Sequence, residues 1–153
     1  MVIDSAGTRE RRLTRGPWSS QVPSWTPDGR RIVFYANPSG RDQLYVMDLA
    51  SESVRPLPAT PGDSRAPSVS PDGSRIAFTA TRDTIGDLYV MDWAGSRIER
   101  LTTGLHVQAQ PSWSADGRRI LFSASPHGVA DVYVINVDGT GLARLTRGAD
   151  GVW

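Results

Sequence analysis

Cysteine and lysine are both missing from this chain of 153 residues, and no long apolar run occurs in it. Without cysteine, disulfides and thiolate metal sites are excluded, while the redox compartment stays open. The basic residues are all arginine, which we interpret as a coding bias first. No segment approaches the roughly 20 apolar residues of a membrane-spanning helix. The first residues, MVIDSAGTRERR, also lack the apolar core of a signal peptide.

An excess of one charge is missing as well. The 17 basic and 16 acidic residues are interspersed and leave a net charge of +1. A nucleic-acid-binding surface would need a concentrated basic face, so we expect no nucleic-acid partner. The densest basic cluster comprises Arg9, Arg11, Arg12 and Arg15. We expect it on an outer strand, where charge discourages pairing between sheets.

Motifs of catalysis and metal binding are also scarce. The sequence holds no G-x-S-x-G nucleophile motif, and its two histidines, His106 and His127, have no further ligand at metal-binding spacing. The segment Asn136 to Gly139 resembles the start of a calcium loop, but no glutamate follows at the twelfth position. We therefore expect no enzyme activity, no cofactor and no metal in this chain.

What the chain does contain is a motif that returns every 44 residues. PSWTPDGRRIVF begins at Pro23, PSVSPDGSRIAF at Pro67 and PSWSADGRRILF at Pro111. Each is followed at the same step by LYVMD or VYVIN. A fixed period of 40–45 residues is typical of a four-stranded β-propeller blade.

The residues within one repeat predict four strands, at 20–26, 30–36, 43–48 and 53–58, with later copies at steps of 44. Apolar residues alternate, so Ile32 and Phe34 point to one face of the sheet and Val33 to the other. Both faces are apolar because each blade lies between two neighbours. The Asp28-Gly29 pair, repeated in every copy, is a hairpin signal between the first two strands.

The phase of the repeat predicts an all-β propeller segment of three four-stranded blades, at 23–66, 67–110 and 111–153. Residues 1–22 align with the last two strands of a blade and predict a leading half-blade. A closed ring needs about four to eight blades. We therefore expect either a part of a larger propeller or a ring completed by association with further copies.

The motif P-S-W-S-P-D-G-x-R-I-x-F, followed by D-L-Y-V-M-D and R-L-T, resembles the TolB-like, WD-repeat-like β-propeller repeat over essentially the whole chain. Ala115, Val69 and Pro56-Leu57-Pro58 depart from it. Repeats of this kind occur in a periplasmic protein that works with an outer-membrane lipoprotein, in gating propellers of prolyl-oligopeptidase-type enzymes and in stand-alone binding proteins. The resemblance implies the fold, and it suggests a periplasmic or other extracytoplasmic location.

The loops that differ between copies are the candidates for function, because two sets of them rim one face of a propeller. The loops before the first strands contribute Trp18, Asp63, Arg65, His106 and Gln108, and those between the second and third strands contribute Arg41, Asp42, Arg82, Asp83 and His127. Mixed aromatic, Arg and Asp side chains suit recognition of a protein or peptide. The sequence thus predicts a non-catalytic binding scaffold; the alternative is the propeller portion of a prolyl-oligopeptidase-like enzyme whose catalytic domain lies outside this chain.

Overall fold

The computed structural model describes residues 2–3, 6–14, 19–58, 60–108 and 110–146, and in these residues it contains strands and turns but no helix. The strands are β1 (Val2–Ile3), β2 (Glu10–Arg11), β3 (Ser20–Trp25), β4 (Arg31–Ala36), β5 (Gln43–Asp48), β6 (Val54–Pro56), β7 (Asp63–Val69), β8 (Arg75–Arg82), β9 (Ile85–Asp92), β10 (Ile98–Arg100), β11 (Ser112–Trp113), β12 (Arg119–Ala124), β13 (Asp131–Asn136) and β14 (Ala143–Arg144).

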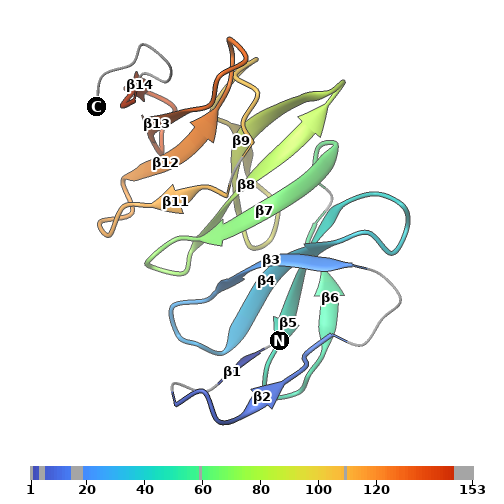
Figure 1. Ribbon diagram of the computed structural model, residues 1–153. Helices are drawn as coiled ribbons and strands as arrows, with labels where there is room; N and C mark the ends of the chain where they lie inside the picture. The colour runs from blue at the N-terminus through green and yellow to red at the C-terminus, as the bar shows by residue number, and fades with distance from the viewer. Residues whose placement is uncertain (1, 4–5, 15–18, 59, 109, 147–153) are drawn as a thin grey trace.

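These strands form three four-stranded antiparallel sheets and one two-stranded sheet, each from strands consecutive in the chain. We call β3–β6 blade 1, β7–β10 blade 2, β11–β14 blade 3 and the pair β1–β2 the half-blade. The sheets follow one another along an arc, with the half-blade at one end and blade 3 at the other (Figure 1). The predicted all-β propeller architecture is confirmed.

The first strand of each blade departs from a regular ladder. In β3 the pairing with β4 shifts register between Gln21 and Ser24, and β7 shifts at the equivalent place. In blade 3 the predicted strand at 108–114 is reduced to β11, preceded by an isolated bridge between Val107 and Ala124. In β3 and β7 the cause is a β-bulge: one extra residue cannot pair, and the ladder breaks there.

The turn between the first two strands is built around an aspartate in every blade. In blade 2 the carboxylate of Asp72 accepts hydrogen bonds from Ser70 Oγ at 2.5 Å, Ser74 N at 3.0 Å and Ser74 Oγ at 2.7 Å. Gly73 follows at a φ of +72°, a conformation that favours glycine. The hydrogen bond from Ser70 is the largest of the effects that lower the pKa of Asp72 from 3.8 to about 2.

The stability of the fold should therefore depend on pH. Hydrogen bonds from Thr26 and Ser114 lower the pKa of Asp28 and Asp116 in the same way. A carboxylate with a lowered pKa stabilises the fold above its unfolded-state pKa, and this contribution is lost as pH falls through the folded-state value. We expect the urea concentration at the midpoint of unfolding to decrease as the pH is lowered from about 4 to about 2. Asp72→Asn should flatten that slope; an unchanged slope would contradict the assignment.

The core lies between blades rather than within them. One buried cluster joins Val33, Val46 and Leu57 of blade 1 to Phe78 and Met91 of blade 2, and a second joins blades 2 and 3 in the same way. The other face of blade 1 carries Ile32, Phe34 and Met47. These side chains pack against Leu13, next to the half-blade. The predicted alternation of Ile32 and Phe34 against Val33 is confirmed, because each sheet buries both of its faces.

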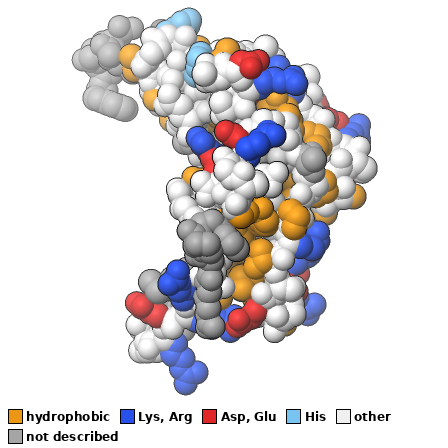
Figure 2. All heavy atoms as spheres, turned by 90° about the vertical axis from the view of Figure 1, so that its right-hand side faces the viewer, with side chains coloured by type: hydrophobic (Ala, Val, Ile, Leu, Met, Phe, Trp, Pro, Cys, Tyr) orange, Lys and Arg blue, Asp and Glu red, His pale blue; other side chains and the backbone are white. Residues whose placement is uncertain are grey.

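The molecule has the shape of a crescent, and the face seen in Figure 2 carries basic and acidic side chains side by side rather than a field of one sign. Arg11 of the predicted basic cluster contacts Glu52 of blade 1 at 3.6 Å. Within the described residues there is no helix long and apolar enough to cross a lipid bilayer.

Candidate functional site

β3, β7 and the segment that leads to β11 bring three equivalent residues to one cavity. Val22, Ala66 and Gln110 each directly precede the repeated proline, and all three line one cavity. Val22 and Ala66 have left-handed backbone angles, with φ of +48° and +49°. Such values are uncommon for alanine and rarer for a β-branched residue. In β3 and β7 the bulge thus turns the chain at the residue before the proline, and that residue lines the cavity.

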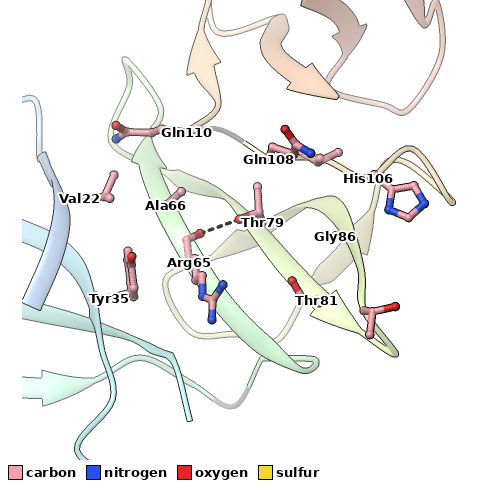
Figure 3. A pocket seen from close by; sticks show the side chains of 12 residues that line it. Val22, Tyr35, Arg65, Ala66, Thr79, Thr81, Gly86, His106, Gln108 and Gln110 are labelled. Carbon is pink, nitrogen blue, oxygen red and sulfur yellow. Dashed lines mark hydrogen bonds between the residues drawn. The ribbon is translucent and has the colours of Figure 1, made fainter. Parts of the chain in front are cut away.

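This cavity has a volume of about 660 Å³ and lies between blades 1 and 2 and the segment that leads to β11. Figure 3 shows its side chains, which come from β3 and β4 of blade 1, from β7, β8 and the hairpin turn of blade 2, and from the segment that leads to β11. The lining residues are Val22, Tyr35, Arg65, Ala66, Thr79, Thr81, Thr84, Gly86, His106, Val107, Gln108 and Gln110.

Several polar groups of the cavity are held in place by hydrogen bonds within the protein. The Tyr35 hydroxyl donates to Gln21 Oε1 at 2.8 Å. Gln108 Nε2 donates to Ser125 Oγ at 2.7 Å, and Gln110 Nε2 donates across the blade boundary to the carbonyl of Pro67 at 2.9 Å. Side chains fixed before binding lose less conformational entropy when a ligand arrives. The cavity is therefore a preformed polar surface.

Four of the predicted site residues pair with one another across the boundary between blades 1 and 2. The guanidinium of Arg65 donates to the carboxylate of Asp42, and Arg41 lies 3.6 Å from Asp63. The hydrogen bond to Asp42 raises the pKa of Arg65. The side chain of Arg65 nevertheless remains half exposed. These residues join two blades, and Arg65 also presents its guanidinium at the cavity.

Other groups at the mouth of the cavity are left open to solvent. Within the described residues, the side chains of Thr81, Thr84 and His106 form no hydrogen bond. His106 has a left-handed φ of +53°, and its imidazole lies beside the hairpin of blade 2 (Figure 3). In that hairpin β8 and β9 are two residues longer than the equivalent strands of blade 1. The mouth thus carries a charged guanidinium, an imidazole and hydroxyl groups.

The structure divides the predicted site residues into three groups. Arg65, His106 and Gln108 line the cavity, whereas Arg41, Asp42, Asp63, Arg82, Asp83 and His127 do not. Arg82, Asp83 and His127 are exposed, Arg82 as the last residue of β8 and the other two in the turns between second and third strands. Trp18 lies outside the described residues. Whether any of them contacts a partner stays a prediction.

Sequence reasoning missed most of the cavity wall, including Val22, Ala66, Gln110 and the threonines Thr79 and Thr81. The available signal was the position before the repeated proline, whose residue type differs in every copy while the Pro-Ser pair that follows it stays constant. The threonines gave no such signal, because only the pairing of β7 with β8 places them beside the bulge.

Comparison with known proteins fixes the family. The model of the TolB beta propeller domain matches residues 1–151. The chain belongs to this family. A TolB-like repeat was predicted from the recurring motif, and that prediction is confirmed.

Individual relatives cover less than the family model does. The Tol-Pal system protein TolB of Bordetella pertussis is 42% identical over 45 residues, which is 29% of this chain and 10% of that protein. The structure of TolB from Acinetobacter baumannii superposes with a TM-score of 0.84 at 24% identity, covering 95% of this chain and 37% of that one. The chain thus spans well under two thirds of these relatives.

Enzymes share the architecture too. Acylaminoacyl peptidase from Pyrococcus horikoshii matches with a TM-score of 0.64 at 15% identity, over 89% of this chain and 26% of that chain. At such identities the likeness concerns the fold alone. The same propeller architecture thus occurs in TolB and in a peptidase.

Proposed function

We propose that this propeller segment is a non-catalytic binding scaffold that holds a protein or peptide partner at the cavity between blades 1 and 2 and the segment before β11. The observation that carries the proposal is the convergence of β3, β7 and the segment before β11 on one preformed cavity of about 660 Å³. Its wall mixes an aromatic ring, a guanidinium, amides and hydroxyls, a combination that suits a polypeptide surface. An extracytoplasmic location, implied by the family resemblance, belongs to the same proposal.

The scaffold would bind its partner by presenting polar side chains in fixed positions. Gln108 and Gln110 are held by hydrogen bonds, so their carbonyl oxygens stay available as acceptors in fixed positions. Arg65, Thr81 and His106 add groups that a partner can pair with directly. A partner strand or loop would thus meet oriented groups without reorganising the blades.

A second candidate is the propeller portion of a peptidase whose catalytic domain lies elsewhere. The match to acylaminoacyl peptidase favours it at the level of fold. In that case the face described above would meet a hydrolase domain instead of a separate partner. The two candidates therefore differ in what the cavity face contacts.

Variants at the cavity test the scaffold proposal. Immobilised wild-type protein is exposed to an extract of the source organism, and retained proteins are identified by mass spectrometry. We expect Arg65→Ala/His106→Ala to bind the retained partner at least about tenfold more weakly. Thr81→Arg, which leaves the Arg65–Asp42 pair intact, should block the cavity mouth and have a similar effect.

The matched control replaces two exposed arginines on the opposite side of the blades, in Arg30→Ala/Arg118→Ala. This control should bind like wild type, and circular dichroism should show the same fold in every variant. Equal binding by wild type, Arg65→Ala/His106→Ala and Thr81→Arg would overturn the assignment of the site. Retention of a hydrolase carrying a G-x-S-x-G motif would favour the peptidase candidate.

A further inference from the structure

In both junctions between complete blades a tryptophan stacks on an arginine, but the tryptophan comes from different places. Between blades 1 and 2, the Arg31 guanidinium lies 4.7 Å from the ring centroid of Trp93. Between blades 2 and 3, Arg75 lies 5.4 Å from the ring centroid of Trp113. The two arginines are equivalent in the repeat, whereas Trp93 follows a third strand and Trp113 ends a first strand. The stacks are favourable because the face of an aromatic ring attracts a cation.

Each junction has a valine at the position where the other junction has its tryptophan. Val69 is equivalent to Trp113, and Val137 is equivalent to Trp93. All four side chains pack against the buried cluster of their junction. A valine is much smaller than an indole, so Val137 fills less space at the edge of its junction than Trp93 does.

A hollow of about 200 Å³ lies beside Val137, between blades 2 and 3. Arg75, Val90, Arg97 and Glu99 of blade 2 border it as well. Val90 is buried, whereas the side chain of Arg97 is 80% exposed and forms an ion pair with Glu99 at 2.7 Å. The hollow thus has an apolar interior and a charged rim, and it adjoins the two residues equivalent to the stacked pair of Arg31 and Trp93.

Blade 3 also keeps the hydrogen-bond acceptor that Trp93 uses in blade 2. The indole Nε1 of Trp93 donates to the carbonyl of Gly73 at 2.6 Å. Gly117 holds the equivalent position in blade 3, and within the described residues no group donates to its carbonyl. The backbone N–H of Val137 donates to the carbonyl of the next residue, Arg118, at 3.0 Å. The turn that carries the open acceptor is therefore held next to Val137.

We propose that this hollow binds a tryptophan side chain of a polypeptide partner. The ring would lie between Arg75 and Val137, as the ring of Trp93 lies beside Arg31, with its N–H directed to the carbonyl of Gly117. A planar guanidinium can contact aromatic rings on both of its sides, so the stacking of Arg75 on Trp113 leaves room for a second ring. None of the residues that line the hollow lines the cavity described above, so the proposal does not depend on the proposed function.

N-acetyltryptophanamide tests the site, because it carries a tryptophan side chain between two peptide groups. Added to the chain with ¹³C-labelled valine methyl groups, it should shift the NMR signals of Val90 and Val137. We expect a dissociation constant on the order of 1 mM, as for other ligands of fragment size. N-acetylleucinamide has the same peptide groups without the ring, and it should bind at least about tenfold more weakly.

The wild-type titration can contradict the proposal without any substitution. Shifts confined to Val22 and Val107, which line the cavity described above, would place the probe at the wrong site. Equal affinity for the two probes would show that the ring is not recognised. Unshifted signals of Val90 and Val137 at about 10 mM probe, ten times the expected dissociation constant, overturn the proposal as well.

Two variants that exchange valine and tryptophan complete the experiment. Val137→Trp places the chain's own indole in the hollow, as in blade 2, and should abolish the shift of Val90. Trp93→Val opens the equivalent place between blades 1 and 2 and should add a second site, seen as a shift of Val46. Wild-type affinity in Val137→Trp, or a folded Trp93→Val whose Val46 signal does not shift, overturns the equivalence of the two junctions and the proposal with it.

Discussion

Replacing Phe78 with alanine should lower the free energy of unfolding by about 4 kcal/mol, because it empties the centre of the junction between blades 1 and 2. Phe78 is fully buried, and its ring stacks on Tyr89 with centroids 5.6 Å apart. It packs with Val33 and Val46 of blade 1, so both sheets border the cavity that would be left. Urea unfolding followed by tryptophan fluorescence measures the change.

Phe34 gives a matched comparison, since it holds the same position one repeat earlier and stacks on Tyr45 in the same way. Its neighbour is only the half-blade, and a hollow of about 330 Å³ already adjoins it. Solvent can enter the space left by Phe34→Ala, so we expect a smaller loss of about 2 kcal/mol. Equal losses at both positions would show that the half-blade covers blade 1 as well as a complete blade would.

Replacing Asp87 with alanine should cost about 3 kcal/mol, because it removes the acceptor at the centre of a buried polar network in blade 2. The side chain of Asp87 is 3% exposed. It accepts hydrogen bonds from Arg100 and from the hydroxyl of Thr102, the latter at 3.1 Å. That hydroxyl in turn accepts from the backbone N–H of Leu88 at 2.9 Å. Without the carboxylate, the buried Thr102 hydroxyl loses its acceptor.

Blade 1 provides the control for this prediction, because it lacks all three members of the network. Gln43, Pro56 and Pro58 stand where blade 2 has Asp87, Arg100 and Thr102. Gln43→Ala should therefore change the urea midpoint little. A loss of stability for Asp87→Ala no greater than for Gln43→Ala would show that the network adds nothing beyond the packing of the strand.

This network also shows how far sequence reasoning reached. The departure of Pro56-Leu57-Pro58 from the repeat was visible in the sequence, but its partner at Gln43 was not recognised. The two positions lie on different strands, and only the pairing of β5 with β6 and of β9 with β10 brings them together. A motif read along the chain cannot show that such substitutions belong to one site.

The candidate binding face was predicted in part for the same reason. Arg65, His106 and Gln108 were found because the segments before the repeated proline differ between copies, although Arg65 lies within β7 and not in the predicted loop. Val22 and Ala66 were missed because their orientation follows from a β-bulge, and the ladder shift that creates it depends on β4 and β8. The partners of Asp42 and Asp63 likewise come from the neighbouring blade.

The sequence by itself determined the four-stranded repeat, its phase and the apolar character of both faces of every blade, because strand periodicity and turn residues act locally. Only the tertiary structure decided which charged residues pair with each other and where the cavity lies. Those properties arise from contacts between blades, and residues 44 positions apart meet there only after the sheets have packed.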